Sequence, residues 1–378
     1  MNSVSGNSIA NIARLHHLMD QNDLSGLVLS SGENFTYLSG IVYPGTLARH
    51  LELANSPRAV ILVWLRHSDP VVVVNATAEG LARRDAPHAK VEVYEAYRES
   101  PYERLVAVLE QEGLSDQRIG FETNFISAKE WKRLEQKLPH MHVFDCANLM
   151  DQVRWIKTKE EIELLKAAAD LLDDVYLEVF PTIVKGDREC DVHARILHAC
   201  IVRGFGWVHG ILNSSRNTIP YAGESDFAFE AGDVIRTDYV AYNRAYPGHL
   251  SRNVILGTPT AQQLRDYRAN RDVYRAAIER CKPGARVGDI YDFIVDEFAK
   301  FGWSYKSIIS GHSIGVWMHQ QNPIITRGSD QRLEEGMVLA MEPHWQHWHL
   351  QDLVLVDKTG PQLLSTKFST DEPFVVEW

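Results

Sequence analysis

The sequence has few cysteines, and they are far apart. Its 378 residues include only Cys146, Cys190, Cys200 and Cys281, without a CxxC pair. Structural disulfides belong mainly to oxidising compartments, and small secreted domains use more closely spaced cysteines. The cysteine pattern therefore predicts free thiols in a cytoplasmic protein.

Long apolar runs and an excess of positive charge are also absent. No apolar run approaches the roughly 18 residues of a membrane span. The polar start, MNSVSGNSIANIARLHHLMD, lacks the apolar core of a signal peptide. The net charge of -11 argues against a nucleic-acid partner, which usually meets a basic face. We therefore expect a protein that acts on a small molecule, with neither a membrane nor a nucleic acid as partner.

The chain is long enough for two domains with sizeable cores, and its 45% hydrophobic and 24% charged residues are ordinary for a globular protein. The first part alternates short apolar strands with helices, which predicts an α/β domain over residues 1–152. Its expected strands are 26–31, 58–64, 70–75 and 117–122, and its expected helices are 7–21 and 102–112.

The second part, residues 153–378, begins with a long amphipathic helix. Thr158 and Glu161 can form a capping box at the start of that helix. Helices then alternate with pairs of strands, which predicts an α+β domain. The expected helices are 159–178, 188–204, 261–280 and 286–301.

Acidic and imidazole side chains recur beside apolar strands of this second part. Alternation along DVIRTDYV puts Arg236, Asp238 and Val240 on one face of a strand. A carboxylate on an inward face is costly unless it is paired or ligated. His249, in PGHLSR, can face Asp238 across a hairpin closed by YNRAYP. Asp238 and His249 are therefore candidates for a site.

Further along, His312 and His319 lie in GHSIGVWMH, Glu342 in GMVLAMEP, and Gln351 in HLQDLVLV. The order and spacing of all these motifs resemble the pita-bread superfamily. That superfamily includes methionine and Xaa-Pro aminopeptidases, prolidase and the metal-free hydrolase creatinase. SSGENFTYLSG is similar to the N-domain signature of creatinase and prolidase, so the resemblance covers the whole chain. It implies a creatinase-like N-terminal domain and a pita-bread catalytic domain.

The resemblance also implies a ligand set that this sequence alters. In the metallopeptidases of the superfamily, Asp, Asp, His, Glu and Glu hold two metal ions. These positions fall on Asp238, His249, His312, Glu342 and Gln351. An imidazole cannot bridge two ions as a carboxylate does, and a neutral amide is a poor ligand. We therefore expect no dinuclear centre.

Two mechanisms stay open. In the favoured one, Asp238, His249, His312 and Glu342 hold one divalent ion, either Zn, Mn or Fe. In the other, which is similar to creatinase, no metal is bound. A histidine then acts as the base, while Asp238 and Glu342 anchor a cationic amidine or guanidine.

The same four residues are the expected catalytic cluster, and by resemblance His319 stabilises a developing oxyanion. Arg252 is expected to orient the carboxylates. Other polar and aromatic residues near the motifs are candidates for lining a small-molecule pocket. The full set of expected substrate contacts is Arg252, Tyr221, Arg216, His209, His349, Trp345 and Gln351.

The resemblance implies a hydrolase that cleaves a C–N bond in a small polar, nitrogen-containing metabolite, similar to creatinase or ectoine hydrolase. Three alternatives remain: an Xaa-Pro dipeptidase or aminopeptidase, a lyase on the same fold, and a non-catalytic pseudo-peptidase that binds other proteins. A homodimer is implied by the resemblance.

Overall fold

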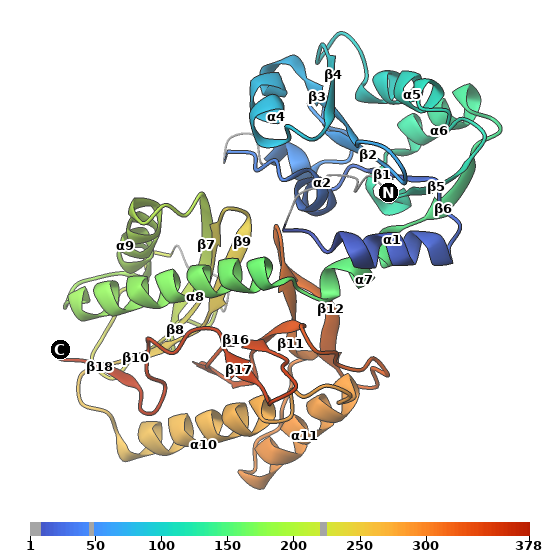
Figure 1. Ribbon diagram of the computed structural model, residues 1–378. Coiled ribbons are helices and arrows are strands. Elements are labelled where there is room, and N and C mark those ends of the chain that lie inside the picture. The colour runs from blue at the N-terminus through green and yellow to red at the C-terminus, as the bar shows by residue number, and fades with distance from the viewer. Residues whose placement is uncertain (1–8, 45–48, 220–224) are drawn as a thin grey trace. The chain divides into compact units, whose positions relative to one another are not determined.

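The computed structural model describes residues 9–44, 49–219 and 225–378. The chain divides into two compact units, Met1–Arg154 and Trp155–Trp378. They are called the N-terminal and C-terminal domains below (Figure 1). Among the described residues, no helix is long and apolar enough to cross a membrane.

The N-terminal domain is built on one mixed sheet. Its strands are β1 (Gly26–Leu29), β2 (Ile61–Leu65), β3 (Val71–Asn75), β4 (Lys90–Tyr94), β5 (Arg118–Phe121) and β6 (His142–Asp145). They lie in the order β4-β3-β2-β1-β5-β6. Its helices are α1 (Ile12–Gln21), α2 (Gly32–Ser39), α4 (Glu79–Asp85), α5 (Pro101–Gln111), α6 (Ala128–Lys137) and α7 (Ala147–Trp155). Strands β2 and β3 are buried at every position, as continuous apolar runs predict.

The C-terminal domain contains two larger sheets and a short hairpin. Its strands are β7 (Trp207–Ser214), β8 (Val234–Asn243), β9 (Tyr246–Leu250), β10 (Asn253–Leu256), β11 (Ile309–Gly315), β12 (Met318–Thr326), β13 (Val338–Met341), β14 (His344–Trp345), β15 (Trp348–His349), β16 (Asp352–Leu355), β17 (Gln362–Leu363) and β18 (Phe374–Val376). One sheet has the order β18-β10-β8-β7, with β9 also paired to β8. The other has the order β12-β11-β13-β16-β17, and β14 pairs with β15.

Four long helices accompany these strands. They are α8 (Lys159–Val179), α9 (Glu189–Val202), α10 (Ala261–Ile278) and α11 (Val287–Lys300). The predicted capping box at the start of α8 is present. The Thr158 hydroxyl accepts from the Glu161 amide, and the Glu161 carboxylate accepts from the Thr158 amide. In Figure 1, α10 and α11 lie together on the side of the strands away from α8.

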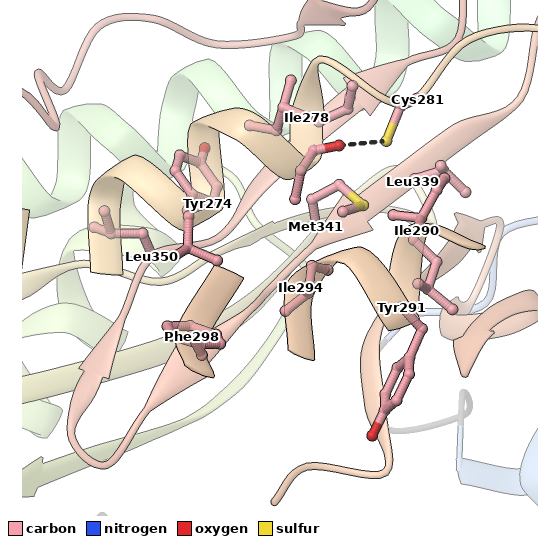
Figure 2. Packing of buried hydrophobic residues seen from close by; sticks show 14 of the residues in the cluster. Tyr274, Ile278, Cys281, Ile290, Tyr291, Ile294, Phe298, Leu339, Met341 and Leu350 are labelled. Carbon is pink, nitrogen blue, oxygen red and sulfur yellow. Dashed lines mark hydrogen bonds between the residues drawn. The ribbon is translucent and has the colours of Figure 1, made fainter. Parts of the chain in front are cut away.

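One apolar core joins α10 and α11 to the second sheet. Figure 2 shows Ile278 and Tyr274 of α10, Ile294 and Phe298 of α11, and Met341 of β13 within this cluster. All five side chains are buried. Each buried side chain of this size contributes about 1.5–3 kcal/mol relative to exposure. This packing fixes the end of β13, from which Glu342 follows.

Strand β9 is held against α8 by a close backbone approach at Gly248. A Cβ atom at this position would lie 2.4 Å from the carbonyl oxygen of Ala168. Only glycine leaves room for that contact. The next residue, His249, is therefore fixed by backbone packing as well as by the pairing of β9 with β8.

Candidate active site

A cavity of about 350 Å³ lies within the C-terminal domain. Seven strands and the loops beside them contribute to its wall. Its lining residues are His209, Gly210 and Ile211 of β7, Arg236, Asp238 and Val240 of β8, His249 of β9, Ser307 and Ile309, His312 of β11, His319 and Gln320 of β12, Glu342, His344 and His349. Segments that are far apart in sequence thus bring six imidazoles, two carboxylates and one guanidinium together.

Asp238 and His249 face each other across β8 and β9. Val240 is the register partner of His249, and His249 Nε2 lies 3.0 Å from Asp238 Oδ1. Burial alone would raise the pKa of Asp238. The hydrogen bond from His249 and the charges of neighbouring groups outweigh burial and hold this pKa well below its usual value. Asp238 is therefore an ionised carboxylate in the cavity.

His312 is a neutral imidazole with one nitrogen free for chemistry. Its Nδ1 lies 3.0 Å from the carbonyl oxygen of Ser313, to which it can only donate. The other nitrogen, Nε2, then carries the lone pair and lies 3.7 Å from Glu342 Oε1. Burial, followed by the nearby His249, lowers the pKa of His312 to about 3. His312 can accept a proton or a metal ion through Nε2.

Glu342 lies at the end of β13, where its amide donates to the carbonyl of Ser310 at 3.0 Å. Burial, together with repulsion from Asp238, raises the pKa of Glu342 to about 8. Without a cation beside it, this carboxyl group is mostly protonated at neutral pH. Such a perturbed acid in a cavity is typical of a functional site.

His349 is a buried imidazole that lacks hydrogen-bond partners. It is 1% exposed, and neither ring nitrogen forms a hydrogen bond within residues 9–44, 49–219 and 225–378. Its Nε2 lies 3.7 Å from Glu342 Oε2. Burial and the charge of Arg236 lower its pKa well below the usual value, so the ring is neutral. An orphaned buried imidazole is costly, and a metal ion would satisfy it.

One divalent ion fits the residues present. One oxygen of Asp238, one oxygen of Glu342 and one ring nitrogen of His349 all lie within 4.8 Å of one another. This set differs from the expected set of Asp238, His249, His312 and Glu342, because it includes His349 and contains neither of the other two imidazoles. His249 Nε2 is hydrogen-bonded to Asp238, and His312 Nε2 lies 3.7 Å from Glu342 Oε1, beside this set but not within it. Carboxylate oxygens with imidazole suit Zn, Mn or Fe.

A dinuclear centre does not fit. Gln351 is fully buried. Its amide oxygen accepts from the Ser251 hydroxyl at 3.1 Å, and the residue lies outside the cavity wall. His249 occupies the other bridging position. A second ion would also meet the positive charge of Arg236, and among the described residues of the wall only Asp238 and Glu342 are anions.

His319 and His209 form a second, adjacent pair of imidazoles. Their ring centroids are 5.3 Å apart, and His319 is also 5.3 Å from His249. Burial and neighbouring imidazoles lower the pKa of His319 to about 4 and also lower that of His209. Both rings are neutral, so each carries one N–H that can donate to a substrate oxygen.

Arg252 is not brought to the cavity. It is 1% exposed, and its Nη2 donates to Asp173 at 2.8 Å and to Asp352 at 2.7 Å. Its Nη1 donates to the carbonyls of Ser251 and Gln351. Arg252 therefore lies in a buried network behind the site, where it ties together the segments that carry His249 and His349.

Two other expected substrate contacts also lie elsewhere. Trp345 stacks on Trp303 with ring centroids 3.8 Å apart, and Arg216 pairs with Asp233 at 2.6 Å. Residues 344–351 do not form one continuous strand, and Gln351 lies outside the strand that carries His349. A turn between β14 and β15 reverses the chain. Tyr221 lies outside the described residues.

Arg236 and His344 belong to the cavity wall but were not among the expected site residues. The signal for Arg236 was present, since alternation along β8 places it on the same face as Asp238. His344 follows Glu342 by two residues, and its Nδ1 lies 3.1 Å from the Glu342 carbonyl oxygen. Alternation along a strand through EPHW would have placed His344 on the same face as Glu342.

Comparison with known proteins is consistent with these features. The sequence model of the creatinase/prolidase N-terminal domain matches residues 11–156, and that of metallopeptidase family M24 matches residues 163–358. The Xaa-Pro dipeptidase of Pyrococcus horikoshii is 21% identical over 368 residues, which cover 94% of this chain and 96% of that enzyme. The Xaa-Pro dipeptidase of Pyrococcus furiosus is 27% identical over 229 residues, or 58% of this chain and 65% of that enzyme.

The fold also matches a solved structure. The X-Pro aminopeptidase from Thermotoga maritima superposes with a TM-score of 0.81 at 20% identity, over 96% of this chain and 99% of that one. The expected architecture, a creatinase-like N-terminal domain followed by a pita-bread domain, is confirmed. Because the family model spans more than half of the sequence, the chain belongs to metallopeptidase family M24, and it is a hydrolase that acts on a C–N bond.

Proposed function

We propose that the chain is a dipeptidase of the Xaa-Pro type that works with a single divalent ion. The names of its relatives support the peptidase alternative over the creatinase-like reading that the sequence favoured. The observation that carries the single-ion part is the buried, unpartnered His349 beside Asp238 and Glu342. The family is a metallopeptidase family, and these three side chains would hold the metal.

The size of the cavity agrees with a short peptide substrate. Small-molecule sites range from about 300 to 1,000 Å³, and this cavity has about 350 Å³. A dipeptide is small enough to fit that space. The substrate class proposed is therefore a short peptide with its scissile bond beside Glu342.

The chain's own groups supply the remaining chemistry. When bound, a divalent ion polarises a carbonyl group and stabilises negative charge on its oxygen. His312 Nε2, which carries a lone pair because Nδ1 donates to Ser313, is placed to accept a proton from the attacking water. His319, on the adjacent wall, is placed to donate its N–H to the developing oxyanion.

Removal of the metal tests this proposal. We expect that treatment with EDTA followed by gel filtration abolishes hydrolysis of alanyl-proline, and that added Mn²⁺ or Zn²⁺ restores it at one ion per chain. Mass spectrometric metal analysis of the reloaded protein gives the stoichiometry, and proline release gives the activity.

Two outcomes would contradict the proposal in different ways. Full activity in metal-free protein would support the creatinase-like mechanism, which needs no metal. Two tightly bound ions per chain would show that the charge argument against a dinuclear centre is wrong.

A further inference from the structure

We propose that Arg236 binds a carboxylate group of the substrate, so that the cavity selects compounds with a free carboxylate close to the scissile C–N bond. The inference rests on the proposed function, because it assumes that the substrate reacts in this cavity. It adds an anion subsite to the ligand set of Asp238, Glu342 and His349.

The position of Arg236 in β8 is fixed. Its register partners are Asn213 on β7 and Asn253 on β10, so it sits on an interior strand of its sheet. One residue, Thr237, separates it from Asp238, and the side chains of Arg236 and Asp238 line the cavity. Arg236 therefore approaches the substrate from the strand that also supplies an acid.

Arg236 lacks a partner of its own. Its Nε is buried without a hydrogen bond, and its guanidinium forms no ion pair within the described part of the chain. The other arginines of this region differ. Arg252 pairs with two aspartates, Asp173 and Asp352, and Arg216 pairs with Asp233. A partly buried cation without a partner is costly unless a ligand supplies the opposite charge.

The charge balance of the cavity indicates the sign of the charge on that ligand. Within the part of the chain that the structure describes, its wall contains two ionisable acids, Asp238 and Glu342, one arginine, Arg236, and six histidines. One divalent ion neutralises the two carboxylates. The guanidinium then leaves one positive charge uncompensated, so an anionic group is attracted and a cationic amidine or guanidine is repelled.

The planar geometry of the Arg236 guanidinium favours a carboxylate as the anionic group. A planar guanidinium presents parallel N–H donors that match the two oxygens of a carboxylate, and such pairs are stronger than neutral hydrogen bonds. Asp238 would not take this role in the loaded site, because its Oδ1 lies 3.0 Å from His249 Nε2 and its carboxylate would also help to hold the ion. The carboxylate must therefore come from the substrate.

A matched pair of ligands tests this proposal without turnover. L-proline and L-prolinamide differ at the carboxylate only, and their binding to the Mn²⁺-loaded protein can be measured by calorimetry. We expect wild-type protein to prefer proline by about 10- to 100-fold, as for hydrogen bonds to a charged partner. In Arg236→Met this preference should fall by a similar factor, with one Mn²⁺ per chain retained, and in Arg236→Lys it should be intermediate.

The control is Arg268→Met. Arg268 lies on α10 in an exposed pair with Glu372, so its loss should leave the preference unchanged. A preference that survives in Arg236→Met would overturn the inference. So would equal binding of the two ligands by wild-type protein, which needs no variant to fold.

Failure of the proposed function looks different. In that case the loaded wild-type protein releases no proline from alanyl-proline, yet it still prefers proline to prolinamide through Arg236. If instead it cleaves the peptide but Arg236→Met keeps the ligand preference, the function stands and the role of Arg236 is wrong.

Discussion

Glu342→Gln is expected to lose both the metal ion and the activity. The amide keeps the shape of the carboxyl group. It cannot supply the anionic oxygen that, together with Asp238 and His349, would hold the ion. The loss of a metal that stabilises several kcal/mol of transition-state charge corresponds to a fall in kcat/KM on the order of 10³-fold or more. Metal analysis and proline release measure the two effects in the same sample.

The fold should survive this substitution. Because the pKa of Glu342 is raised to about 8 in the metal-free protein, its carboxyl group is mostly neutral at pH 7, as the amide is. Glu335→Gln is a suitable control, since it makes the same chemical change at an exposed position outside the cavity. A fully loaded Glu342→Gln protein would show that Glu342 is not a ligand.

Arg252→Met is expected to act on stability rather than on substrate binding. It leaves Asp173 and Asp352 buried without their shared cation, and breaking a buried ion pair from one side costs about 3–5 kcal/mol. Urea unfolding followed by tryptophan fluorescence measures this loss. All tryptophans except Trp64 and Trp131 lie in the C-terminal domain, so the signal comes mainly from there.

The comparison for this variant is again Arg268→Met, which removes an exposed pair of about 0–1 kcal/mol. Arg252→Met should therefore lower the urea midpoint far more than the control does. If instead its midpoint stays near wild type while KM for alanyl-proline rises, Arg252 is a substrate contact, as the sequence suggests, and the buried network has little energetic weight.

The helices of the C-terminal domain could be predicted well because their ends are marked locally. The capping box at Thr158 and Glu161 places the start of α8, and α10 begins after a similar box at Thr260 and Gln263. These signals depend on neighbours three residues away, which a sequence shows directly. The helix α2, in contrast, was not expected. Its residues follow Ser31, whose capping role is not distinctive in SSGENF.

The site could be predicted only in part, for a reason that concerns strand geometry. Asp238 and His249 were expected to face each other because a hairpin relates them by simple alternation, and they do. His349 was expected only as a wall residue. Its role depends on the turn at Gln346, which has a positive φ of 56°. The chain then leaves β15 after His349 and enters β16, in another sheet, at Asp352, so Gln351 and His349 face different surroundings.

The proposed ion would draw its donors from β8, from the end of β13 and from β15, which meet only after most of the C-terminal domain has formed. An unfolded chain offers no such trio at close range. The metal should thus bind late in folding, after the strands have assembled, and stabilise the folded domain against unfolding. Durability of this enzyme would then track the supply of its ion, by mass action.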